Sequence, residues 1–354
     1  MSFLKKVVKK FDDLTIMADG KASAEFAGFI DTGSYSLNAG LSGSIYGGLA
    51  DNKVLALAGE TTVGKTFMAL GVVKTFLDRD PTAIVIYFDT ESAVTRQMMR
   101  DRGIDDSRVV IAEPSTIEEF RTRALNILEE YEKTDDREPM MMVLDSLGML
   151  SSIKETGDIV AGDDKRDMTK QQLLRGAFRT LRLKLSKVQV PMIVTNHTYE
   201  VIGSYVPKKE MSGGGGLKFA ADIIAFISKQ QEKDEKTKEV IGNVLTFKMV
   251  KSRLSRADTK VHVLLTYDKG FDRYYGLEDI AFEHGIFKKL PKGVEANGIT
   301  FPSRDAFDRL LRNEPEKIYT KAVLDQIEQA VKADFQYGIP SAAELLLEET
   351  EDNA

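Results

Sequence analysis

One short segment of this 354-residue chain has the residue types and the spacing needed to bind phosphate groups. Its G-x-x-x-x-G-K-T pattern places glycine where a side chain would keep the backbone away from an anion. The lysine would hold the β- and γ-phosphates of ATP, and the threonine hydroxyl would coordinate Mg²⁺. The predicted phosphate loop consists of Gly59, Glu60, Thr61, Thr62, Val63, Gly64, Lys65 and Thr66.

The flanking residues supply the structural context that this motif requires. An apolar run of strand length, residues 54–58, precedes the loop, and a helical segment follows from residue 65 to about residue 78. In a strand–loop–helix arrangement the backbone N–H groups and the N-terminus of the helix face the anion. We therefore interpret the glycine pattern as a nucleotide site rather than as a chance loop.

Two acidic residues lie at the ends of other apolar runs. Asp145 ends the run 140–144 and is expected to hold a Mg²⁺-bound water, which would complete the coordination begun by Thr66 and phosphate oxygens. Glu91 follows the run 84–88 and is our candidate for positioning and deprotonating the attacking water. The alternative for Glu91 is a carboxylate that caps a helix.

His197 is one of only three histidines and follows the apolar run 192–195. With no cysteine in the chain and no second histidine nearby, metal ligation is disfavoured. We prefer a γ-phosphate sensor that passes the nucleotide state to the next loop. The alternative is a buried histidine whose hydrogen bonds are satisfied.

The order of elements predicts an α/β fold. Continuous apolar runs are typical of parallel strands buried on both faces, and helical stretches at 117–131 and 169–188 separate several of them. Two later runs, 244–249 and 260–265, have no helix between them and predict an antiparallel hairpin at one edge. Ligands bind beyond the carboxyl ends of such strands, where the polar clusters lie. The five predicted strands after the phosphate loop cover residues 84–88, 109–111, 140–144, 192–195 and 223–227.

Composition narrows the class of protein. The chain is 42% hydrophobic, and the absence of cysteine fits a reducing compartment. No apolar run approaches about 18 residues, so we expect no membrane span. The net charge is −6. Five acidic residues lie after residue 341, so the rest of the chain has a net charge near zero. That tail is either a solubilising end or a phosphate mimic that competes with nucleic acid for basic surface.

Residues 3–14 alternate apolar side chains with lysines and predict an amphipathic basic helix. We expect it to dock on a partner protein. A membrane-surface helix and a transit peptide are the alternatives.

Two polar loops, residues 151–168 and 199–216, are candidates for binding nucleic acid. Long loops without structure are usually functional or disordered, and basic residues mixed with an aromatic residue and glycines suit a phosphate backbone. A line of arginines on the helix after the first loop adds to this surface or is simply solvated. The candidate DNA-binding residues are Lys154, Lys165, Arg166, Arg175, Tyr205, Lys208, Lys209, Gly213 and Gly214.

At this point the chain resembles the RecA family of recombinases, and most closely its phage-type, UvsX-like branch. The resemblance covers about residues 29–285. It rests on the segments Ile30-Asp31-Thr32-Gly33-Ser34, Tyr87-Phe88-Asp89-Thr90-Glu91, Leu144-Asp145-Ser146-Leu147-Gly148, Asn196-His197-Thr198-Tyr199-Glu200 and Gly213-Gly214 with Leu217-Lys218-Phe219.

The resemblance implies a RecA-type ATPase core, residues 31–267, that carries the two DNA-binding loops. Residues 1–30 would dock on the adjacent protomer, residues 268–341 would form a small C-terminal region, and residues 342–354 are the acidic tail. Because the body ends earlier than in longer relatives, a separate duplex-binding domain is expected to be missing or reduced.

The resemblance also implies an activity: helical filaments on single-stranded DNA, with ATP between protomers, that pair this strand with a homologous duplex. The family's trans-acting cations fall on Lys251 and Arg253, and its adenine-stacking tyrosine falls on Met98. A single-strand-binding protein and a mediator or loader are the implied partners. The implied location is the cytoplasm, that of the host cell if the chain is encoded by a bacteriophage.

Two other functions use the same kind of core. A hexameric helicase usually carries a large N-terminal attachment, and there is little room for one before Gly59. A non-catalytic, nucleotide-sensing recombination mediator would be favoured by loss of Lys65, Glu91 or Asp145, and all three are present.

Overall fold

A computed structural model describes residues 9–10, 24–163, 167–200, 209–212, 215–233, 240–266 and 270–336. Several sequence predictions therefore lie outside the described residues. They are the N-terminal helix apart from Lys9 and Lys10, the acidic tail, and the DNA-binding candidates Lys165, Arg166, Tyr205, Lys208, Gly213 and Gly214.

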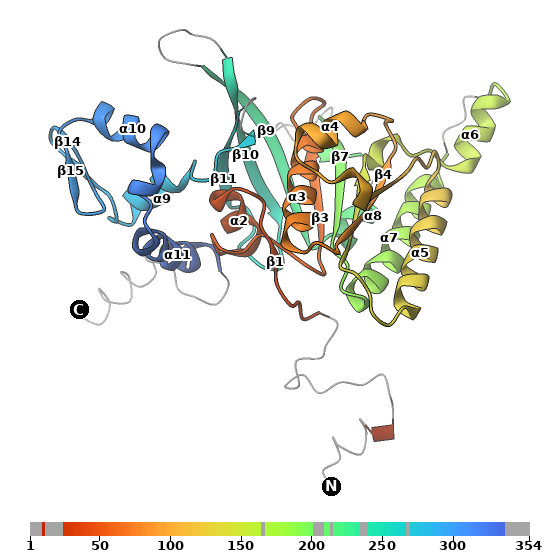
Figure 1. Cartoon of the computed structure of the whole chain (residues 1–354). Helices are drawn as coiled ribbons and strands as arrows, with labels where there is room; N and C mark the ends of the chain where they lie inside the picture. Colours follow the sequence, from red (N-terminus) through yellow and green to blue (C-terminus); the bar gives the residue numbers. More distant parts are fainter. Residues whose placement is uncertain are drawn as a thin grey trace, which may run out of the picture.

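A ten-stranded sheet forms the centre of the molecule (Figure 1). Its order is β12-β11-β10-β9-β3-β7-β6-β4-β5, with β8 paired to the end of β7. The strands from β9 to β5 are parallel, and β10, β11 and β12 add antiparallel pairs at one side, so the predicted edge hairpin is confirmed. The bounds are β3 Val54–Gly59, β4 Ile84–Asp89, β5 Val109–Ala112, β6 Met140–Asp145, β7 Met192–Glu200, β8 Lys209–Met211, β9 Ile223–Lys233, β10 Val240–Lys251, β11 Lys260–Thr266 and β12 Gly270–Phe271.

Helices cover both faces of this sheet, as continuous apolar strands require. Alternate residues of one strand feed two different cores: Leu55 and Leu57 pack toward α3, whereas Val54, Ala56 and Ala58 pack toward α5 and α7. The helices of the first face are α2 (Tyr35–Ser42), α3 (Lys65–Arg79) and α4 (Arg96–Asp101). Those of the second face are α5 (Ile117–Lys133), α7 (Lys170–Lys187) and α8 (Gly215–Ala220).

A smaller C-terminal body packs beside the edge strands. Its core includes Ala39 and Ile45 from the α2 region, so the two parts share buried apolar surface. Glu328 on the last helix joins them further, because its carboxylate accepts hydrogen bonds from Ser44 Oγ at 2.7 Å and Ile45 N at 2.8 Å. The elements of this body are α9 Leu277–Glu283, β13 Lys288–Leu290, β14 Gly293–Ala296, β15 Ile299–Phe301, α10 Arg304–Asn313, η4 Pro315–Lys317 and α11 Lys321–Phe335.

The remaining short elements are β1 (Phe29–Ile30), β2 (Leu49–Ala50), η2 (Asp106–Arg108) and η3 (Leu147–Met149). No helix within the described part of the chain combines the length and the apolar character needed to cross a bilayer.

The structure corrects the view of both predicted loops. Residues 151–168 contain α6 (Ile153–Val160), because Ser152 and Glu155 form a reciprocal capping box that opens the helix. In the second loop β7 continues to Glu200 and pairs with β8, and α8 begins at Gly215. Backbone pairing thus orders the described residues at both ends of that segment.

Candidate functional site

The phosphate loop lies at the carboxyl end of β3, between β9 and β7, and leads into α3. Gly64 adopts φ 99°, a left-handed conformation that favours glycine. A Cβ on Gly59 would meet Ile227 O and Val63 Cγ1, each at 2.9 Å. Gly64 is therefore required by its backbone conformation, and Gly59 by the close approach of Ile227 and Val63.

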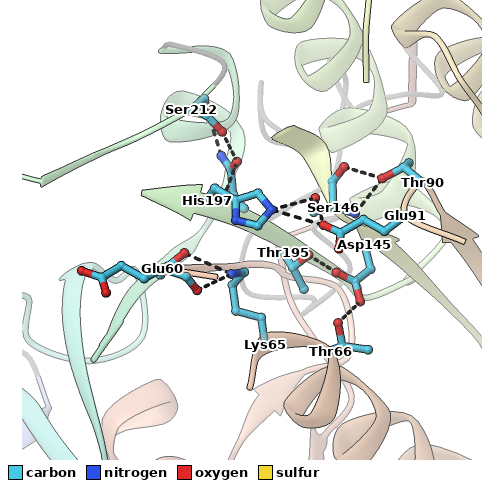
Figure 2. A network of polar contacts seen from close by, with 12 residues as sticks. Glu60, Lys65, Thr66, Thr90, Glu91, Asp145, Ser146, Thr195, His197 and Ser212 are labelled. Carbon is cyan, nitrogen blue, oxygen red and sulfur yellow. Dashed lines mark hydrogen bonds and ion pairs between the residues drawn. The ribbon is translucent and has the colours of Figure 1, made fainter. Parts of the chain in front are cut away.

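Lys65 is buried within this loop. Its Nζ donates hydrogen bonds to Gly59 O at 3.0 Å and Glu60 O at 2.8 Å (Figure 2). Burial lowers the pKa of Lys65, while the negative charges of Glu91 and Asp145 oppose that change. Phosphate oxygens could replace the two carbonyls as hydrogen-bond partners of the same ammonium group.

Asp145 at the end of β6 is the centre of a hydroxyl cluster. Its Oδ2 accepts from Thr66 Oγ1 at 2.6 Å and from Tyr87 OH at 2.8 Å, and its Oδ1 accepts from Thr195 Oγ1. Mg²⁺ prefers oxygen ligands such as hydroxyl and carboxylate groups, and it usually takes few of its ligands from the protein. Thr66 and Asp145 therefore fit the ion. Among the described residues, no group of three or more His, Cys, Asp or Glu forms a separate metal site.

Glu91 follows β4 and points toward the ends of β6 and β7 (Figure 2). Its Oε1 accepts from Ser146 Oγ at 2.6 Å and lies 3.2 Å from His197 Nε2. Burial acts to raise the pKa of Glu91, but the hydrogen bonds from Ser146 and His197, together with the charge of Lys65, hold it below its ordinary value. These contacts therefore favour the ionised form of Glu91, whose Oε1 acts as a hydrogen-bond acceptor.

The alternative that Glu91 caps a helix is wrong. Thr95 is the N-cap of α4, and its hydroxyl accepts from Met98 N. The turn after β4 is held by Asp89 instead, whose carboxylate accepts from Glu91 N at 3.1 Å and Val94 N at 2.9 Å. The side chain of Glu91 is thus left for the site.

The alternative that His197 is a buried, satisfied histidine is also wrong. Its side chain is 29% exposed and faces Glu91. The neighbouring Asn196 contacts Ser212 at the start of the glycine run, through Asn196 Nδ2 to Ser212 O at 2.9 Å and Ser212 Oγ to Asn196 Oδ1 at 2.5 Å. His197 therefore contacts Glu91, the candidate general base, and the adjacent Asn196 contacts Ser212 in the second loop. A γ-phosphate sensor would need both contacts.

Lys251 and Arg253 do not reach the phosphate loop of their own chain. Lys251 Nζ donates to Lys218 O at 3.0 Å and Phe219 O at 3.1 Å, and Arg253 Nε lies 3.4 Å from Asp222 Oδ1. Asp222 Oδ2 in turn accepts from the backbone N–H of Val54, the first residue of β3. The cations thus lie toward the start of β3, whereas the phosphate loop follows its end.

Met98, the candidate for the adenine contact, is half-buried on α4 and packs on the core beneath α3. Sequence reasoning missed the aromatic surface nearby. Arg102 donates from Nη1 to Met98 O at 2.9 Å, and its guanidinium lies 4.7 Å from the ring centroid of Phe67. Phe67 directly follows Thr66, and this position next to the phosphate loop was the signal in the sequence that could have identified it.

Three DNA-binding candidates fall on described residues. Lys154 is exposed in the first turn of α6, with Nζ 3.8 Å from Asp167 Oδ1, and Arg175 is exposed on α7. Lys209 Nζ bonds to Glu60 Oε1 of the phosphate loop. The three candidates lie on different elements, and Lys209 links the second loop to the nucleotide site.

Four other polar contacts at the site were missed from the sequence. They come from Tyr87 and Thr195 on Asp145, from Ser146 on Glu91, and from Lys229, whose Nζ donates to Thr62 O at 2.7 Å. For Ser146 the signal was its position directly after Asp145. The others depend on which strands are neighbours.

Comparisons with known proteins agree with this geometry. A family model described as the RecA N-terminal domain matches residues 1–272. The chain is 32% identical over 257 residues to the recombination and repair protein of Enterobacteria phage T4, which is 73% of this chain and 64% of that protein. Thus the match spans less than two thirds of the phage relative.

Two bacterial relatives are matched over more of their length. Protein RecA of Deinococcus radiodurans is 27% identical over 289 residues, covering 81% of this chain and 76% of that protein. Protein RecA of Paenarthrobacter aurescens is 26% identical over 347 residues, covering 96% and 93%.

Proposed function

We propose, since the chain belongs to the RecA family, that it is an ATP-dependent DNA recombinase. It assembles as a helical filament on single-stranded DNA and pairs that strand with a homologous duplex. One observation carries this proposal: Lys65, Asp145 and Glu91 converge on one site, while Lys251 and Arg253 lie away from it. A protomer with this division needs a neighbour to complete its active site.

The residues of one protomer would divide the chemistry as follows. Lys65 binds the β- and γ-phosphates, and Thr66 with Asp145 would hold Mg²⁺. The ion, when bound, neutralises charge on the phosphate oxygens. Glu91 orients the attacking water and accepts its proton, and His197 reports the γ-phosphate to the second loop through the adjacent Asn196.

Lys251 and Arg253 would act on the γ-phosphate of the neighbouring protomer. A cation supplied in trans can contribute about 10³–10⁵ in rate. In the isolated chain Arg253 is held by Asp222 and Lys251 by backbone carbonyls, so assembly must exchange these partners for phosphate oxygens. Hydrolysis is thereby tied to filament formation.

The edge strand β5 suits the filament contact. Among the described strands it is the last on its side of the sheet, and its Val110 and Ile111 are 56% and 41% exposed. An open edge with exposed apolar side chains can accept an extended segment by main-chain pairing. We assign this role to residues 1–30 of an adjacent copy.

DNA would bind the two loops, and Lys154, Arg175 and Lys209 would contact its phosphates. Helix α6 also exposes apolar side chains, which would face the DNA. A single-strand-binding protein and a loader complete the expected set of partners. The working compartment would be the host cytoplasm if the chain is phage-encoded, as the T4 relative is.

Electron microscopy with single-stranded DNA and a non-hydrolysable ATP analogue tests the proposal. We expect extended helical filaments, absent when the nucleotide is omitted, and strand exchange in a subsequent assay with a homologous duplex. Closed six-membered rings would indicate a hexameric helicase instead of a recombinase. Unassembled particles under saturating nucleotide would contradict the shared active site.

A further inference from the structure

Tyr87 occupies a place in the site for which the phosphate-binding motifs provide no role. It lies on β4, its side chain is fully buried, and its hydroxyl donates to Asp145 Oδ2 at 2.8 Å. The same oxygen accepts from Thr66 Oγ1 at 2.6 Å. Tyr87 and Thr66 thus donate to the same oxygen of the carboxylate at the proposed metal site.

The order of strands explains how the carboxylate is fixed. β6, which ends in Asp145, lies between β4 and β7. Each flanking strand contributes one hydroxyl, Tyr87 from β4 to Oδ2 and Thr195 from β7 to Oδ1. Both carboxylate oxygens are therefore held from neighbouring strands, and the rotation of the group about its bond to Cβ is restricted.

The hydroxyl of Tyr87 is not explained by packing. The ring lies in the apolar core beneath α3, among Val85, Met141 and Val143, where a phenyl ring would pack equally well. The contribution of the hydroxyl is instead its hydrogen bond to Asp145.

We infer that Tyr87 is a positioning residue for the magnesium site, fixing the orientation in which Asp145 would hold a Mg²⁺-bound water beside Thr66. This inference rests on the proposed function, because it presumes that the site binds Mg²⁺ with ATP. Partners of metal-site ligands commonly contribute about 10- to 100-fold to metal affinity. Since Thr195 still holds the other oxygen, the expected effect of losing Tyr87 lies near the lower end.

The test uses Tyr87→Phe in the full-length chain. Binding of a fluorescent, non-hydrolysable ATP analogue is titrated with Mg²⁺, and Mn²⁺ binding to the same complex is followed by electron paramagnetic resonance. We expect the concentration for half-saturation by either metal to rise about tenfold. Nucleotide binding in EDTA should not change.

Tyr131→Phe is the matched control, because the Tyr131 hydroxyl donates to Glu138 O outside this site. It should leave the metal titration unchanged, whereas Thr195→Val should raise the half-saturation like Tyr87→Phe. Tyr87→Met serves as a second apolar variant if the phenylalanine variant does not fold. Wild-type metal dependence in a folded Tyr87 variant would overturn the inference, whereas a wild-type chain that binds no nucleotide would overturn the proposed function.

Discussion

The hydroxyl of Ser146 donates a hydrogen bond of 2.6 Å to Oε1 of Glu91, and so joins the candidate base to the residue that follows the candidate metal ligand. His197 Nε2 lies 3.4 Å from the same hydroxyl and 3.2 Å from the same carboxylate oxygen. The groups proposed to sense phosphate and to activate water thus form one hydrogen-bonded unit. A change in one contact must alter the others.

Glu91→Gln should retain ATP binding and lose most turnover. The amide keeps the size of the side chain but accepts a proton poorly, and a general base contributes about 10²- to 10⁴-fold. Single-turnover hydrolysis on DNA, beside equilibrium nucleotide binding, measures the two effects. Glu113→Gln is the control, because Glu113 contacts Ser92 on the same rim but lies outside the unit. Normal hydrolysis by Glu91→Gln would remove Glu91 from the mechanism.

Ser146→Ala should change the pH dependence of hydrolysis. The hydrogen bonds from Ser146 and His197 keep the pKa of Glu91 below its ordinary value against the opposing effect of burial. The base works as a carboxylate, so activity falls as the pH drops through this pKa. Loss of the Ser146 donor raises the pKa, and the acidic limb of kcat/KM should move to higher pH. An unmoved acidic limb would separate Ser146 from the base.

The double variant Lys251→Ala with Arg253→Ala should bind ATP as a free protomer and lose DNA-stimulated turnover by about 10³- to 10⁵-fold. Lys248→Ala is the matched control on the same strand, since Lys248 pairs with Asp258 at 3.0 Å. Mixing the double variant with Lys65→Ala should restore activity, because some interfaces then combine an intact phosphate loop with intact cations. Absence of restoration in mixed filaments would argue against action in trans.

Removing a positive charge from the proposed DNA-binding surface of the protein should change the salt dependence of DNA affinity. For single strands the slope of log affinity against log salt is about −0.7 per phosphate contact. Lys154→Ala and Arg175→Ala should each make the slope shallower by about that amount. Lys187→Ala is the control, because Lys187 pairs with Glu132 at 2.6 Å near the end of α7. If a variant shows the wild-type slope, the substituted residue does not contact a DNA phosphate.

Glu328→Ala should loosen the C-terminal body. The carboxylate is buried and holds Ser44 and the N–H of Ile45, so its loss leaves a buried donor without a partner, at about 1–3 kcal/mol. Urea unfolding measures this change. Gln329→Ala, at an exposed position next to Glu328 on the same helix, should change stability by less than about 0.5 kcal/mol. Equal effects of the two variants would contradict the specific role of Glu328.

Much of the site could be predicted because it depends on short stretches of chain. Gly59, Gly64 and Lys65 belong to one short motif of adjacent residues, and Gly64 adopts its left-handed conformation directly before α3. Asp145 and Glu91 could be chosen because Asp145 ends one buried parallel strand and Glu91 lies two residues after another, and such strands end at one edge of the sheet.

The errors have a different origin. Residues 151–168 were predicted as a loop because polar composition concealed a capping box at Ser152. The strand predicted at 192–195 runs on to Glu200, since pairing with β8 stabilises a polar segment that has no apolar pattern of its own. In both cases hydrogen bonds outweighed composition.

The sequence by itself determined the α/β class, the phosphate loop and the acids at the strand ends, because apolar runs and glycine spacing act over a few residues. Only the tertiary structure decided that β4 and β7 flank β6, which places Tyr87, Thr195, Ser146 and His197 around two carboxylates. It also decided that Arg253 faces Asp222, away from its own phosphate loop. Strand order and register join residues far apart in the chain, and local periodicity carries no record of which distant strands will pair.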